Sequence, residues 1–291
     1  MSGTFQKILI PVDFSINTEV SVRKAMELAD DENGELHLLH VLSCRKRFPG
    51  SSAIDSSENK ETAGGHTRHQ ELMDQLKQMI GQEKPMLRVH QYIIDALSIS
   101  LTIGKIANRL NVDLIIISKN KTHRFFPFLN TVRPCKLAIT TGKTILTLKP
   151  GALHQSIKTI VVPVTGSSPY NKMQAIALLH AKYRFKVHLV SFLNNKDKTD
   201  NFSSASLVQS FRWIKENIRC PVEFTVLHGR NRAKTLLRYA ENTGADMMLV
   251  DPFEETKTGW LDQQIPDVIP AASKIQLLLF SPELNTIKIT Q

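Results

Sequence analysis

The chain has 291 residues, 42% of them hydrophobic, and carries a formal net charge of +10. This length accommodates two ordinary domains, and the composition is that of a globular protein. Three cysteines without paired spacing or a CxxC motif exclude a disulfide framework and a cysteine-based zinc site. The longest apolar runs fall short of the roughly 18 residues that span a bilayer. We therefore expect a soluble, cytoplasmic protein that has no signal peptide and makes no membrane contact.

Short apolar runs alternate with longer segments of helical period along the first half of the chain. The runs are rich in Ile, Leu and Val and show little alternation, as expected of parallel strands that are covered on both faces. The predicted strands are residues 7–12, 35–42, 87–94, 113–118 and 144–149. The predicted helices are residues 18–31, 69–82, 100–111 and 132–142. Strands and helices that take turns in this way predict right-handed crossovers and an α/β, doubly wound sheet.

The second half of the chain repeats this order of segments. "TIVVPV" at 159 matches "ILIPV" at 8, "VHLVSFL" matches "LHLLHVL", and "LLLFSP" matches "LTLKP". "LLRYAENTGADMMLVD" matches "IGKIANRLNVDLIIIS", which places Asp246 on Asp113. The repeat predicts two domains of the same fold in tandem.

The first copy holds extra chain between its second and fourth strands. Residues 44–69 are polar and rich in Ser and Gly, without apolar period, so we expect a mobile surface loop there. The two copies meet near "KPGALHQS", between Pro150 and Ile157. The predicted domains are residues 1–150 and 157–291.

The phrases "ILIPVDFS", "LHLLHVL" and "IANRLNVDLIII" together resemble the universal stress protein family, and the likeness extends over both halves. The resemblance implies two tandem five-stranded parallel sheets of order 3-2-1-4-5. This fold class is flavodoxin-like and adenine-nucleotide-hydrolase-like, with helices on both faces of each sheet. It also implies that the two domains pair within the chain as a pseudo-dimer. Many members of the family bind ATP, and others do not.

In an open α/β sheet, ligands bind beyond the carboxyl ends of the strands where the strand order reverses. Asp13 ends the first predicted strand, and the resemblance has Asp13 bind the nucleoside while the main chain near Val41 meets the adenine. An equally good interpretation is that Asp13 caps the helix that starts near residues 17–19. The candidate nucleotide site, in the first domain alone, comprises Pro11, Asp13, Val41, Ser118, Lys119, Lys121, Arg124, Asn130 and Thr131.

The family's ATP-binding members carry glycines after the fourth strand, where bare main chain wraps the phosphates. Here no glycine lies between Gly104 and Gly142, and the end of the segment aligns Asn130 and Thr131 with the family's G-S pair. Residues 118–149 contain basic but no acidic residues, so side-chain cations could still hold an anion. In the second copy Thr165 replaces the strand-end aspartate, and carboxylates crowd residues 251–267. We expect no ATP there.

The leading hypothesis is a non-enzymatic stress-response protein that binds or regulates partners and has lost standard ATP binding. It uses no cofactor and no metal. The alternative is a protein that binds ATP or another adenine nucleotide at a divergent basic site in the first domain; a weak ATPase is less favoured. Partners beyond the pairing of the two domains are a homodimer or an unidentified protein. The positive net charge would suit nucleic acid, but no DNA- or RNA-binding motif is visible, so we do not expect nucleic acid as a partner.

Overall fold

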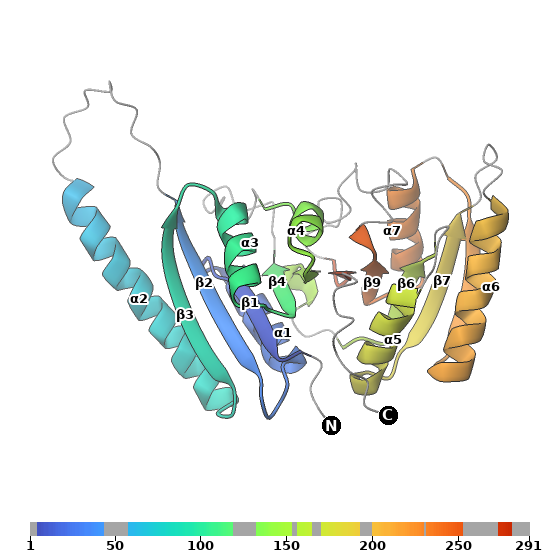
Figure 1. Cartoon of the computed structure of the whole chain (residues 1–291), viewed down its shortest axis with the longest axis horizontal. Helices are drawn as coiled ribbons and strands as arrows, with labels where there is room; N and C mark the ends of the chain where they lie inside the picture. Colours follow the sequence, from blue (N-terminus) through green and yellow to red (C-terminus); the bar gives the residue numbers. More distant parts are fainter. Residues whose placement is uncertain are drawn as a thin grey trace, which may run out of the picture.

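One continuous ten-stranded sheet runs through the whole chain. The computed structural model describes residues 5–43, 58–118, 132–152, 156–164, 170–192, 200–229, 231–252 and 273–280. Within them the strand order is β3-β2-β1-β4-β5-β10-β9-β6-β7-β8 (Figure 1). Each half of the sheet therefore has the order 3-2-1-4-5, as the resemblance implied, and its strands are parallel. The α/β doubly wound prediction is confirmed.

The first half of the chain supplies five strands and four helices to the described structure. They are β1 (Lys7–Pro11), α1 (Ile16–Leu28), β2 (Glu35–Ser43), α2 (Glu58–Glu83), β3 (Arg88–Ala96), α3 (Ile99–Arg109), β4 (Leu114–Ser118), α4 (Pro134–Thr141) and β5 (Thr144–Leu148). A short 3₁₀ turn, Pro150–Ala152, follows β5. Every residue of β4 and β5 is buried, which explains why the apolar residues of these strands show little alternation with polar ones.

The second half repeats the succession. Its elements are β6 (Thr159–Pro163), α5 (Tyr170–Lys182), β7 (Lys186–Phe192), α6 (Asp200–Asn217), β8 (Val222–Leu227), α7 (Arg232–Asn242), β9 (Met247–Val250) and β10 (Gln276–Leu279). Helices α1, α2, α5 and α6 pack on one face of the sheet, and α3, α4 and α7 pack on the other.

A repeated aspartate fixes the start of each central strand. Asp113 Oδ2 accepts hydrogen bonds from the amides of Gln6 (3.0 Å) and Lys7 (2.8 Å) at the beginning of β1. Asp246 Oδ2 accepts from the amides of Lys158 (2.7 Å) and Thr159 (2.9 Å) at the beginning of β6. This shared role accounts for the match between Asp113 and Asp246 in the sequence.

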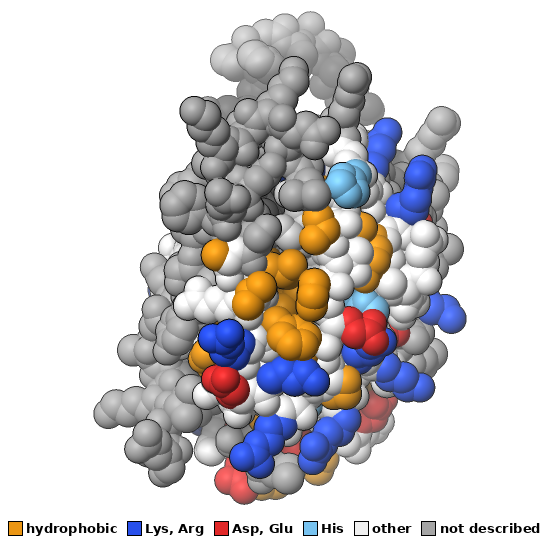
Figure 2. Space-filling model, turned by 90° about the vertical axis from the view of Figure 1, so that its right-hand side faces the viewer, with side chains coloured by type: hydrophobic (Ala, Val, Ile, Leu, Met, Phe, Trp, Pro, Cys, Tyr) orange, Lys and Arg blue, Asp and Glu red, His pale blue; other side chains and the backbone are white. Residues whose placement is uncertain are grey.

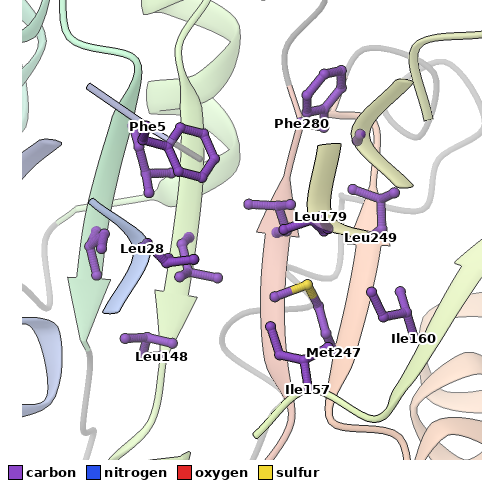
Figure 3. Close-up of a cluster of buried hydrophobic side chains, with 14 of the residues drawn as sticks. Phe5, Leu28, Leu148, Ile157, Ile160, Leu179, Met247, Leu249 and Phe280 are labelled. Carbon is purple, nitrogen blue, oxygen red and sulfur yellow. The ribbon is translucent and has the colours of Figure 1, made fainter. Parts of the chain in front are cut away.

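The two halves join edge to edge. Strand β10 pairs with β5 in antiparallel fashion, and Leu277 lies opposite Thr147. Buried apolar side chains from both halves, among them Leu148, Ile157 and Met247, line this seam (Figure 3). Beside it, the Tyr183 hydroxyl donates to Glu27 Oε1 at 2.5 Å and so ties α5 to α1. The halves share one sheet and one hydrophobic layer on each face.

The predicted surface loop at 44–69 is wrong over its second part. Helix α2 begins at Glu58, so residues 58–69 are helical, and residues 44–57 lie outside the described residues. Residues 66–72 of α2 are exposed or half-buried, and Met73 is the first residue after them that is fully buried, so this stretch shows no apolar period. The Glu, Lys and Ala residues at its start nevertheless have high helix propensity, and the helix extends back over them.

Candidate functional site

The carboxyl end of β1 carries Asp13 in a tight turn that leads into α1. Asp13 is 7% exposed, and its Oδ1 accepts hydrogen bonds from the Ser15 amide (3.1 Å), the Ser15 hydroxyl (2.6 Å) and the Thr18 hydroxyl (2.9 Å). Ser15 is the N-cap of α1, and its side chain accepts from the Asn17 amide. Phe14 reverses the chain with φ = 56°. Asp13 thus supports the capping residue of α1 from two positions before it, which is close to the capping interpretation.

The carboxyl end of β4 lies next to this turn, because β4 pairs with β1. Ser118 ends β4 and is fully buried. Its hydroxyl donates to Asn17 Oδ1 at 3.4 Å, across the point where the strand order reverses. The side chains of Ser118 and Asn17 therefore bridge the place where, in a glycine-bearing site, main chain alone would stand.

The main chain of Val41 lies beyond the end of β1. The Val12 amide donates to the Leu39 carbonyl at 2.8 Å, so Leu39 directs its main-chain groups toward β1. In a parallel ladder alternate residues face the same neighbour, and Val41 therefore directs its amide and carbonyl to the same side as Leu39. Strand β1 ends at Pro11, whereas β2 continues to Ser43. The main chain of β2 around Val41 therefore extends past β1 and borders the turn at Asp13.

Two histidines, His40 of β2 and His69 of α2, lie next to the turn that holds Asp13 and Phe14. The His40 ring lies 4.6 Å from the His69 ring and 4.7 Å from that of Phe14, and His40 Nδ1 is 2.8 Å from the Val12 carbonyl. Burial lowers the pKa of both His40 and His69 below the ordinary value. Sequence reasoning missed this cluster because it requires the position of α2. The available signal was Phe14, an aromatic residue in the turn after β1, together with His40 on the neighbouring strand β2.

In the second half of the chain, charged side chains lie at the carboxyl ends of β6 and β9. Lys172, on the first turn of α5, is 1% exposed, and its ammonium donates to the Pro163 carbonyl at 2.8 Å. The connection from β6 to α5 is two residues longer than the connection from β1 to α1. Lys172 is therefore the third residue of its helix, as Thr18 is in α1. Asp251, which follows β9 as the counterpart of Ser118, is also buried. A buried ammonium at the position of Thr18 and a buried carboxylate at the position of Ser118 thus replace two hydroxyl groups of the first half.

The structure brings four predicted site residues together at the carboxyl ends of the central strands β1, β2 and β4. They are Pro11, Asp13, Val41 and Ser118. The others, namely Lys119, Lys121, Arg124, Asn130 and Thr131, lie outside the described residues, as does Thr165 of the second copy. Among the residues described, no three His, Cys, Asp or Glu side chains are grouped so as to hold a metal ion. Nor does any helix in the described part of the chain have the length and hydropathy to cross a membrane.

The fold and its two strand-end sites define a tandem α/β protein of the doubly wound class, with the reversal of strand order that commonly forms a ligand site. Residues 4–129 match the sequence profile of the universal stress protein family. The sequence likeness to that family therefore covers most of the first half of the chain. No curated protein has a sequence that matches this chain.

Solved structures extend the likeness to the whole chain. A universal stress protein from Archaeoglobus fulgidus DSM 4304 is 14% identical over 97% of this chain and 98% of its own, with a TM-score of 0.63. A functionally unknown protein from Pseudomonas aeruginosa PAO1 is also 14% identical, over 96% of this chain and 93% of its own, with a TM-score of 0.53. At this identity the comparison shows the shared fold, including that of the second half.

Proposed function

We propose that this chain is a stress-response protein that works by binding or regulating partners and has lost the family's standard mode of ATP binding in both halves. The match of residues 4–129 to the universal stress protein family supports the stress-response role. The loss of ATP binding is supported by one observation in particular. Side chains occupy the reversal point of the strand order in each half, Ser118 with Asn17 in the first and Lys172 in the second.

The physical reason lies in how main chain holds a triphosphate. A phosphate cradle needs residues without Cβ atoms, so that amide groups can approach the oxygens closely. In the first half Ser118 places a fully buried hydroxyl at the end of β4. In the second half the buried carboxylate of Asp251 stands at the equivalent position, where it would repel a phosphate. Neither strand end has the bare main chain that the cradle requires.

The environment of Asp13 does not favour a hydrolytic role. General-base catalysis needs a group that can accept a proton from a water next to the substrate. Asp13 follows the strand that borders the first reversal point, and its Oδ1 already accepts three hydrogen bonds from its own turn. This arrangement is suited to holding the start of α1 in place, and it supports a protein without catalytic activity.

Isothermal titration calorimetry with ATP, ADP and cyclic AMP tests the loss of nucleotide binding. We expect no heat of binding at nucleotide concentrations up to the millimolar range. A reference titration of the Ser118→Gly variant shows whether removal of one side chain restores any affinity. Micromolar binding of ATP to the unaltered protein would contradict the proposal.

A second candidate function is adenine-nucleotide binding at the first reversal point. The observation that favours it is the main-chain edge of Val41, which lies beside Asp13 and could meet an adenine ring. The Asp13→Asn variant separates the two candidates, because its side-chain amide oxygen can still accept from Ser15 and Thr18 while the negative charge is lost. Binding that is present in the unaltered protein and falls at least tenfold in Asp13→Asn would favour this second function.

A further inference from the structure

We propose that β8 and the adjoining flank of α6 form a homodimer interface, in which β8 pairs with β8 of a second copy in antiparallel orientation. This edge lies at the end of the sheet opposite to the β3 edge. Apolar side chains gather on the face that is turned to the viewer in Figure 2, with Lys and Arg around them. The exposed apolar members are Val208 on α6 (54% exposed) and Phe224 (55%) and Val226 (38%) on β8.

The main chain of β8 presents its outward groups at the edge of the described sheet. The Val187 amide of β7 donates to the Pro221 carbonyl at 2.8 Å, so odd-numbered residues of this segment face β7. By the alternation of a parallel ladder, the amides and carbonyls of Val222, Phe224 and Val226 face outward. An edge of this kind is a template for pairing with another strand.

The side chains of β8 fit those of a second β8 that runs antiparallel to it. With Thr225 on the two-fold axis, Phe224 lies directly opposite Val226 of the second copy, and both residues direct their main-chain groups toward the partner. Aromatic and β-branched side chains in this arrangement form a favourable cross-strand pair, and the symmetry makes the pair twice. The same chain already uses antiparallel edge pairing once, between β5 and β10.

The helical layer fits the same symmetry. Phe211 of α6 packs edge-on against Phe224 at 5.5 Å between ring centroids, so Phe224 lies on the α6 face of the sheet. Helix α6 contacts both β7 and β8. Because strands are about 4.8 Å apart, a helix centred between these two strands would lie about 10 Å from its symmetry mate, which is the usual separation of packed helices. The second α6 would then cover Val208 and Phe224.

The charges also favour a second copy at this edge. Glu223 is the one charged residue within β8, and Lys186 of β7 binds its carboxylate at 2.6 Å. No like charges within the two β8 strands therefore meet near the axis. The opposite edge strand, β3, carries three exposed ionisable residues, Arg88, His90 and Asp95, of the kind that protects a sheet edge from pairing.

Light scattering after gel filtration, over a range of protein concentrations, tests the interface. We expect a mass of twice 32.8 kDa at high concentration, and a mass of one chain for Phe224→Lys at every concentration. Leu101→Lys is the matched control, because Leu101 is 67% exposed on α3, in the other half of the chain. This control should still dimerise.

Amide hydrogen exchange of the unaltered protein gives an independent reading that does not depend on any variant folding. As concentration rises, the outward amides of Phe224 and Val226 should gain protection, whereas the Thr225 amide, which faces β7, should be protected throughout. A monomer at all concentrations would overturn the proposal. So would a dimer that persists in Phe224→Lys, or outward amides that stay unprotected in the dimer.

Discussion

Thr147 offers a direct test of the packing at the seam between the two halves. It lies on β5 opposite Leu277, is 2% exposed, and its hydroxyl has no hydrogen-bond partner among the described residues. A buried polar group without a partner costs about 1–3 kcal/mol. Thr147→Val keeps the shape of the side chain and removes that cost. We expect the free energy of unfolding to rise by about 1–2 kcal/mol, and Tm to rise by about 2–5 °C.

The same substitution at Thr141 is the matched control. Thr141 is also buried, but its hydroxyl donates to the Leu137 carbonyl at 2.7 Å and accepts from the Lys143 amide at 3.2 Å. Thr141→Val should therefore lower the free energy of unfolding by about 1–2 kcal/mol, and urea unfolding of the two variants should move in opposite directions. If Thr147→Val were destabilising to the same degree, the Thr147 hydroxyl would have a partner such as a buried water, and the reasoning would fail.

Three further changes test other parts of the structure. Gln276→Met removes a fully buried amide whose oxygen and nitrogen have no partner among the described residues, so it should raise the midpoint of urea unfolding; a lowered midpoint would refute this. Tyr183→Phe removes the hydrogen bond to Glu27 and should cost about 1–2 kcal/mol in the same assay, and no loss would mean that the contact contributes nothing to stability. Burial, helped by the charge of His90, lowers the pKa of His37 from 6.5 to about 4. Because the unfolded chain then binds a proton more readily, the contribution of His37 to stability should be complete above pH 6.5 and fall by at most about 3 kcal/mol as the pH drops toward 4. His37→Gln should flatten that dependence, and an unchanged slope would contradict the assignment.

The strands of this fold were predictable because burial on both faces leaves a strong apolar signal. The predicted segment 113–118 and the observed β4, Leu114–Ser118, differ by one residue, and β5 ends one residue before its prediction. The repeat of Asp113 at Asp246 was visible because both copies need a carboxylate to fix the start of a central strand. These features arise from local sequence that has one dominant physical role.

The parts that escaped prediction depend on contacts between distant segments. The polar start of α2 shows no apolar period, so its true beginning at Glu58 could not be read from the sequence. The contact between His40 and His69 depends on how α2 packs against β2, which the predicted helix at 69–82 did not indicate. Lys172 was missed for another reason: α5 starts late relative to β6, and a strand-based alignment sets Lys172 against Val20 instead of Thr18.

Determination of the structure with saturating Mg²⁺ and ATP tests the central claim most directly. We predict that neither half holds a nucleotide, and that the hydrogen bond from Ser118 to Asn17 and the one from Lys172 to the Pro163 carbonyl persist. An adenine ring bound to the main chain of Val41, with loop amides after β4 on the phosphates, would contradict the account.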